Sequence, residues 1–163
     1  MRKSTGFTLI ELIVVIAIIA ILAAIVAPNA FKAIEKSRIS GLEGDYRNIK
    51  TGAMSYYSDT GTWPANNNTT GFIANDGTGA WSGPYLEKWP QRNAWGGTYV
   101  YRKDTANVFV PTVEERYIVA NSVAASSAQK FDLNVNDNSN NTGIVRFSGS
   151  PATVNMEISD DAT

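Results

Sequence analysis

The chain has 163 residues, of which 44% are apolar and 10% aromatic, enough for one folded domain with an appendage. It contains neither histidine nor cysteine, which removes the commonest general base, the commonest nitrogen ligand for metals and the thiolate nucleophile. The formal net charge is -1, so no broad basic face is available for nucleic acid. Composition therefore argues against an enzyme and against a nucleic-acid-binding protein.

An apolar segment begins close to the N-terminus. Residues 7–27 contain a single charged side chain, Glu11, and a helix of this length would span the hydrocarbon core of a bilayer, about 30 Å thick. Arg2 and Lys3 precede the segment, so the positive-inside rule places the first residues in the cytoplasm and the rest of the chain outside it. The helical pattern continues beyond the apolar run, and we predict one helix over residues 7–58 with a membrane-spanning first half.

The carboxylate of Glu11 has two interpretations. Thr8, three residues earlier, completes a T-x-x-E capping box, in which the carboxylate accepts a backbone N–H at the start of the helix. Alternatively, an ionisable side chain within a membrane-spanning segment marks a specific partner, because a charge there is costly unless it is paired. The spacing of the residues does not separate the two interpretations.

The stretch Gly6-Phe7-Thr8-Leu9-Ile10-Glu11, followed by the apolar run, resembles the class III signal of type IV pilins and of the pseudopilins of type II secretion. The resemblance implies that a prepilin peptidase removes a leader of residues 1–6 by cutting between Gly6 and Phe7, and that it methylates the new amine of Phe7. It also implies that Glu11 pairs with the terminal amine of a neighbouring subunit during assembly.

Pro28 falls where the same family has a helix-kinking proline. Proline removes one hydrogen bond of the helix, so we expect a bend or a locally loosened turn there. The resemblance thus makes Phe7, Glu11 and Pro28 the assembly residues.

Beyond Pro28 the helix has two stripes at three- and four-residue spacing. We expect the apolar stripe to pack on the globular head and the stripe of small side chains to allow close approach of loops or of neighbouring subunits; tolerated surface residues are the alternative for the small stripe. The apolar stripe consists of Ile39, Leu42, Tyr46, Ile49, Ala53 and Tyr57, and the small stripe of Ala33, Ser37, Gly41, Gly44, Asn48, Gly52 and Ser55.

Residues 59–163 form the predicted extracytoplasmic head. It begins with a long polar loop that we expect four apolar side chains to pin to the head: Trp63, Phe72, Ile73 and Trp81. The patterns then predict strands over residues 99–101, 116–121, 143–148 and 153–158, and a short helix over residues 126–135. We therefore predict an α+β fold, a pilin-like ladle in which a small antiparallel sheet packs against the long helix.

Two segments of the head resemble the major pseudopilin of type II secretion. They are Gly83-Pro84-Tyr85-Leu86 and Trp95-Gly96-x-x-Tyr99-x-Tyr101. This resemblance favours a pseudopilin over a surface pilin.

Oxygen-bearing side chains alternate from Asp132 onward, as at the start of a calcium loop. However, Asp137 stands where such a loop requires glycine, and Gly143 where it requires a bidentate glutamate. We favour a polar turn, and keep calcium binding by Asp132, Asn136 and Asp137 as the alternative because major pseudopilins often bind calcium in the late loops of the head. No other cofactor is expected.

The combined features predict a structural subunit of a homo-oligomeric helical filament, not an enzyme. The resemblance implies residence in the cytoplasmic membrane before assembly into a periplasmic or cell-surface filament. Its implied partners are the prepilin peptidase, an inner-membrane assembly platform and minor pilins or pseudopilins. We favour the major pseudopilin of a type II secretion-like system; a type IV pilus pilin is the first alternative, and a monomeric membrane-tethered binding module is the second.

Overall fold

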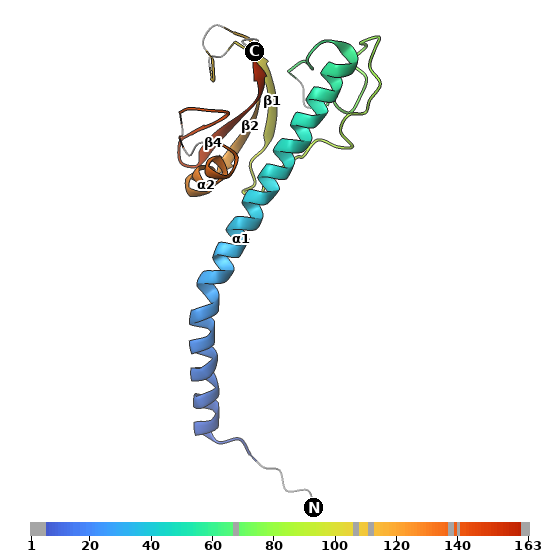
Figure 1. The fold of residues 1–163 in the computed structure, drawn as a ribbon. Helices are drawn as coiled ribbons and strands as arrows, with labels where there is room; N and C mark the ends of the chain where they lie inside the picture. The colour runs from blue at the N-terminus through green and yellow to red at the C-terminus, as the bar shows by residue number, and fades with distance from the viewer. Residues whose placement is uncertain are drawn as a thin grey trace, which may run out of the picture. The chain divides into compact units, whose positions relative to one another are not determined.

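The structure, a computed structural model, describes residues 6–66, 69–105, 108–110, 113–136, 139 and 141–160. It contains a long helix followed by a small antiparallel sheet and a second helix (Figure 1), which confirms the predicted α+β fold. The elements in chain order are α1 (Leu9–Thr60), β1 (Tyr99–Asp104), β2 (Glu115–Val123), α2 (Ala125–Val135), β3 (Val145–Ser148) and β4 (Ala152–Asp160). The chain divides into two compact units, Met1–Ser37 and Arg38–Thr163.

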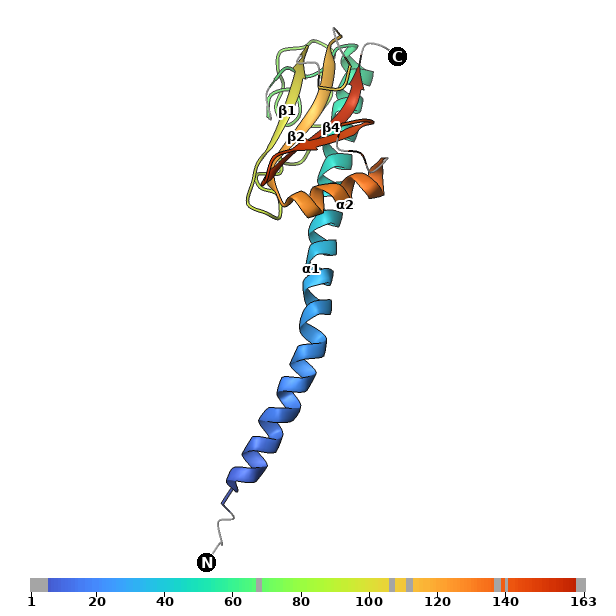
Figure 2. The same cartoon turned by 90° about the vertical axis from the view of Figure 1, so that its left-hand side faces the viewer.

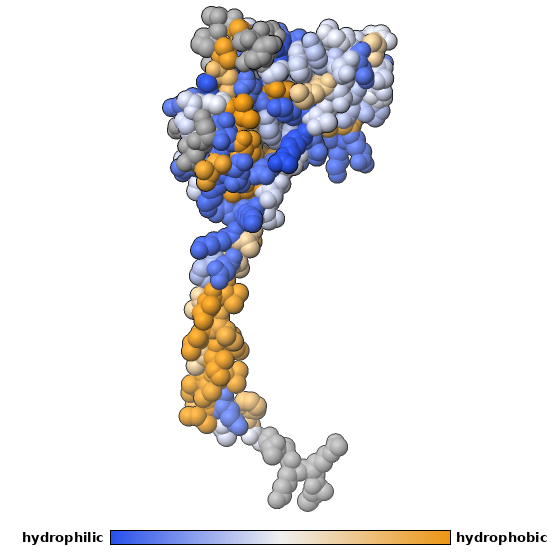
Figure 3. Space-filling model, viewed as in Figure 1, coloured by the Kyte–Doolittle hydropathy of each residue, from blue (hydrophilic) through white to orange (hydrophobic). Residues whose placement is uncertain are grey.

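The first unit contains the N-terminal part of α1, whose apolar side chains point outward in every direction. The large apolar residues from Leu9 to Val26 are 45–75% exposed, and Figure 3 shows them as a continuous orange surface. In length and composition the helix is long and apolar enough to cross a membrane. Leucine and alanine favour helix, and residues 9–26 contain no glycine or proline, which accounts for an uninterrupted helix in this stretch.

The second unit is built on a four-stranded sheet with strand order β1-β2-β4-β3, in which every pairing is antiparallel. The C-terminal part of α1 packs on one face of this sheet; Figure 2 shows β1, β2 and β4 in front of the helix. The buried residues of α1 follow the predicted three- and four-residue spacing, and all of them except Gly52 and Tyr56 join the sheet residues in one core. They are Ile39, Leu42, Tyr46, Ile49, Gly52, Ala53 and Tyr56.

The prediction that Tyr57 belongs to the buried apolar stripe was wrong. Tyr57 is 44% exposed and stacks on Trp63, with 4.5 Å between ring centroids, whereas Tyr56 is only 2% exposed. The Tyr56 hydroxyl donates a hydrogen bond to Asp76 in the following loop. The stripe advances by three residues from Ala53 because a period of 3.6 residues drifts against a fixed spacing of four.

Two tyrosine hydroxyls tie α1 to the sheet. Tyr46 donates a hydrogen bond to the carbonyl oxygen of Glu157 at 2.6 Å, and Tyr99 donates one to Asp45 at 2.7 Å. Burial, reinforced by the charge of Glu157, raises the pKa of Tyr46 to about 12. Burial and the hydrogen bond to Asp45 also raise the pKa of Tyr99. Both hydroxyls therefore stay protonated, as donors, at physiological pH.

The loop between α1 and β1 is held by aromatic side chains, as predicted. Phe72 is fully buried, with its ring centroid 5.1 Å from that of Tyr101 and 5.4 Å from that of Trp89. The indole N–H of Trp81 donates a hydrogen bond to the carbonyl oxygen of Gly71 at 2.9 Å. These contacts fix a long polar segment whose described residues form no helix and, apart from an isolated bridge between Thr70 and Ala74, no strand.

A buried carboxylate organises residues 108–110. Glu115, at the start of β2, is fully buried, and its two oxygens accept backbone N–H bonds from Val108 at 2.8 Å, from Phe109 at 2.6 Å and from Val110. The guanidinium of Arg146 on β3 donates to the carbonyl oxygens of Val108 and Phe109. Glu115 thus binds the N–H groups of this segment, and Arg146 binds two of its carbonyl oxygens.

Replacing Glu115 by glutamine is expected to destabilise the head by about 3 kcal/mol, because a charged acceptor is lost and an amide N–H₂ then faces a backbone donor. Unfolding of the full chain in mild detergent measures this, and hydrogen exchange should accelerate at Val108, Phe109 and Val110. Glu87→Gln, at an exposed position, is the matched control and should cost less than about 0.5 kcal/mol. Equal stability of the two variants would refute the role given to Glu115.

Candidate functional site

The start of α1 brings together the residues that the sequence marks for processing and assembly. The backbone N–H of Thr8 donates to Glu11 Oε2 at 2.8 Å, the Thr8 hydroxyl donates to the same oxygen at 2.6 Å, and the N–H of Glu11 approaches Thr8 Oγ1 at 3.3 Å. This is the predicted capping box, so the first interpretation of Glu11 is confirmed. The box explains why the helix begins at Leu9 and not at Phe7.

The capping box uses only one side of the carboxylate. Both hydrogen bonds from Thr8 end on Oε2, and within the part of the chain that the structure describes Oε1 accepts none. A carboxylate has about four lone-pair sites and can serve two donors at once. The two interpretations of Glu11 are therefore compatible, since the same side chain can cap its own helix and bind an amine of another chain.

The surroundings of Glu11 are apolar. Phe7, Ile10, Val14 and Val15 line with it a surface hollow of about 310 Å³. Phe7 is 79% exposed, and Gly6 is exposed as well, so the predicted cleavage bond lies in an accessible segment that precedes the helix. Residues 1–5 of the predicted leader lie outside the described residues.

Pro28 lies inside α1, which continues through it. Because proline has no N–H, the carbonyl oxygen of Ala24 lacks its usual helical donor. The side-chain amide of Asn29 approaches the carbonyl oxygen of Ile25 at 3.5 Å. Loosening of the helix at Pro28 remains a prediction for the assembled state.

The candidate calcium residues fall at the end of α2. The amide N–H₂ of Asn136 donates to Asp132 Oδ1 at 3.2 Å and to the carbonyl oxygen of Thr142 at 3.3 Å, while its oxygen accepts the N–H of Ile144 at 3.3 Å. The side chain of Asn136 therefore stabilises the turn between α2 and β3 through three hydrogen bonds. Asp137 lies outside the described residues, and among those described no group of three or more acidic or metal-binding side chains could hold a metal ion. The contacts of Asn136 are those of the polar turn that the sequence favours.

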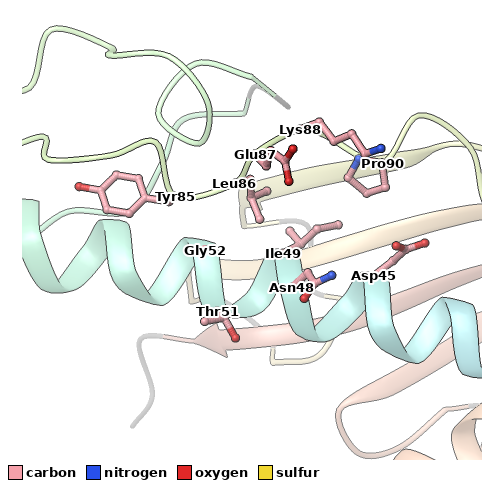
Figure 4. A pocket seen from close by; sticks show the side chains of 10 residues that line it. All are labelled: Asp45, Asn48, Ile49, Thr51, Gly52, Tyr85, Leu86, Glu87, Lys88 and Pro90. Atoms are coloured by element: carbon pink, nitrogen blue, oxygen red, sulfur yellow. The ribbon is translucent and has the colours of Figure 1, made fainter.

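A second feature of the head was not foreseen from the sequence. A groove of about 410 Å³ lies between about two turns of α1, from Asp45 to Gly52, and the segment that follows Pro84, and Figure 4 shows its lining. At its floor, a Cβ on Gly52 would lie 3.1 Å from Leu86 and 3.3 Å from the carbonyl oxygen of Tyr85. The small stripe thus permits close approach at Gly52, by a loop of the same chain. Gly41 and Gly44 face open space.

Comparisons with known proteins match two regions of the chain. A family model described as the prokaryotic N-terminal methylation motif matches residues 1–27, and one described as PilW, C-terminal, matches residues 33–115, just over half of the chain. Together with the fold, they define a type IV pilin-like subunit with a class III prepilin motif, which is a structural protein and not an enzyme. The chain belongs to the PilW C-terminal family.

A solved structure supports the fold. The major type IV pilin PilA1 from Clostridium difficile is 18% identical, with a TM-score of 0.51 over 77% of this chain and 97% of that chain. At this identity the likeness shows a common pilin-like fold alone. None of the curated proteins matches the chain.

Proposed function

We propose that the chain is a minor pilin of a type IV filament. The observation that carries the proposal is an N-terminal methylation motif leading directly into a helix whose apolar side chains are exposed on all sides. Such a surface must be covered by lipid before assembly and by neighbouring helices in a filament, because exposed apolar area of this extent is unfavourable in water. The match of residues 33–115 to the PilW family favours a pilin of the minor type.

The proposed pathway begins in the cytoplasmic membrane, with the head outside the cytoplasm. A prepilin peptidase cuts between Gly6 and Phe7 and methylates the new Phe7 amine. The inner-membrane assembly platform then adds the subunit to the filament, where Glu11 pairs with the Phe7 amine of a neighbour. The apolar helices supply cohesion, and the pairing selects the axial register because an unpaired charge in their core is penalised.

Mass spectrometry of the chain purified from its native membrane tests this pathway. We expect loss of residues 1–6 and one added methyl group on Phe7. A chain that retains its leader, or one cleaved elsewhere, would contradict the pathway whatever the function of the head. Replacement of Gly6 by a bulky residue is the matched control and should leave the leader uncut.

The major pseudopilin of a type II secretion-like system is the second candidate. It is favoured by the two head segments that resemble that protein, but the structure gives both segments local roles. A Cβ on Gly83 would lie 2.7 Å from the Trp81 ring, and Gly96 adopts φ +84°. Glycine is therefore required at both positions for structural reasons that apply equally to a pilin and to a pseudopilin.

Deletion of the gene distinguishes the two candidates. Loss of surface filaments, or of antibody label along them, supports the pilin. Failed export of secreted enzymes with surface filaments intact supports the pseudopilin.

A further inference from the structure

After the apolar segment and before the first buried residue of the head, α1 has a short stretch with exposed apolar and basic side chains. Phe31 is 71% exposed and Ile34 is 50% exposed, whereas Ile39, the next large apolar residue, is buried in the head with 4% exposed. Lys32 and Lys36 are exposed on the same stretch. We refer to Phe31, Lys32, Ile34 and Lys36 as the collar.

The collar has two sides. Phe31 and Ile34 are three residues apart and Lys32 and Lys36 four apart, so each pair shares one side of the helix, with the two pairs on roughly opposite sides. Among the described residues neither lysine forms an ion pair. Glu35 lies between them in the sequence, which leaves the stretch with a small positive charge.

The position of the collar relative to the apolar segment follows from helix geometry. If Ala27 marks the end of the hydrocarbon-spanning run, a rise of about 1.5 Å per residue places Phe31 about 6 Å and Lys36 about 13 Å beyond it. The polar headgroup region of one leaflet is about 5–7.5 Å thick, so Phe31 falls within it and Lys36 beyond it. Phe31 would then lie at the level where aromatic residues collect, and the lysines at or above the lipid phosphates.

We propose that the collar docks on anionic phospholipid headgroups of the outer leaflet of the membrane that α1 spans. Phe31 and Ile34 are buried against the glycerol layer and the adjoining ends of the acyl chains. The ammonium groups of Lys32 and Lys36 bind lipid phosphates. The docked collar holds the precursor at a fixed depth until it is added to the filament. The inference rests on the membrane span of the proposed function and adds to it a lipid requirement.

The absence of cysteine allows a direct test with the full chain. A single cysteine at Ser37 is labelled with a fluorophore, and the chain is reconstituted at low density into phosphatidylcholine vesicles with or without phosphatidylglycerol. We expect quenching by a headgroup-attached quencher to rise about twofold when phosphatidylglycerol is present, because each lysine near an anionic surface is attracted to it. Lys32→Gln with Lys36→Gln should abolish this rise.

Arg47→Gln is the matched control, since Arg47 is a basic residue that is also exposed on α1 but lies within the head; it should keep the full response. Equal quenching in both kinds of vesicle, or a response that survives the double lysine substitution, would overturn the proposal. Quenching that changes only with protein density would also overturn it, and would assign the collar to a second copy of the chain. Flotation of the vesicles tests the membrane span separately, so that its failure is distinguished from failure of the collar.

Discussion

Replacing Glu11 by glutamine is expected to reduce filament assembly at least tenfold while membrane insertion and cleavage after Gly6 continue. Glutamine can still accept the N–H of Thr8, since the capping box admits glutamate or glutamine at this position. It carries no charge, so it cannot neutralise the Phe7 amine of a neighbouring subunit in an apolar helix core. Immunoblots of sheared filaments against total membrane protein measure the ratio.

Two further variants separate capping from pairing. Thr8→Ala removes the hydroxyl that donates to Glu11 Oε2 but leaves the carboxylate, and it should assemble nearly as well as the parent. Glu11→Ala removes both functions and should assemble no better than Glu11→Gln. If Thr8→Ala loses assembly while Glu11→Gln keeps it, capping and not pairing is what matters. If all three variants assemble normally, the role given to Glu11 in assembly is wrong. If the parent chain itself is absent from sheared filaments, the tethered binding module is favoured instead.

The helical part of the fold could be predicted because its determinants are local. The apolar run and the capping box predicted the start of α1 to within two residues, and the stripe from Ile39 to Ala53 predicted its packing face. Tyr57 was assigned wrongly because the choice between two adjacent tyrosines depends on Asp76, a partner in a later loop. A spacing rule contains no information about such a partner.

The tertiary contacts of the head could not be predicted from the sequence in the same way. The strand predicted over residues 116–121 begins one residue after Glu115, and nothing in the sequence shows that this carboxylate accepts three N–H bonds from residues 108–110. Asn93 is another example, since it is 5% exposed and its side chain bonds a strand 28 residues away. Both are buried polar groups whose partners are fixed only when the chain is folded.

In the candidate site, too, local features were predicted from the sequence and spatial ones were not. Glu11 was identified from its position in the motif, and its bond to Thr8 from the capping spacing. Only the geometry shows that one oxygen serves the cap while the other accepts no hydrogen bond from the described residues, and this makes the two interpretations compatible. The groove beside Gly52 was missed because it is formed by segments more than thirty residues apart.

Gly97→Ala is expected to destabilise the head more than any other glycine-to-alanine change in it, by about 3 kcal/mol or more. A Cβ at this position would lie 1.8 Å from the carbonyl oxygen of Asn121 and 2.9 Å from the side-chain nitrogen of Asn93. The first of these is backbone in β2, so relief requires movement of the strand. Such movement would break the 2.7 Å bond that Asn93 donates to the same oxygen.

The same substitution in α1 provides the matched control. A Cβ on Gly44 would meet nothing within 4 Å, and alanine favours a helix interior over glycine by about 0.5–1 kcal/mol. Gly44→Ala should therefore stabilise the chain while Gly97→Ala destabilises it, which excludes a general effect of added methyl groups. Denaturant unfolding of the full chain in mild detergent, followed through its four tryptophans, measures both. If Gly97→Ala unfolds at the parent midpoint, the turn before β1 tolerates displacement, and the contact between Gly97 and Asn121 does not constrain the head.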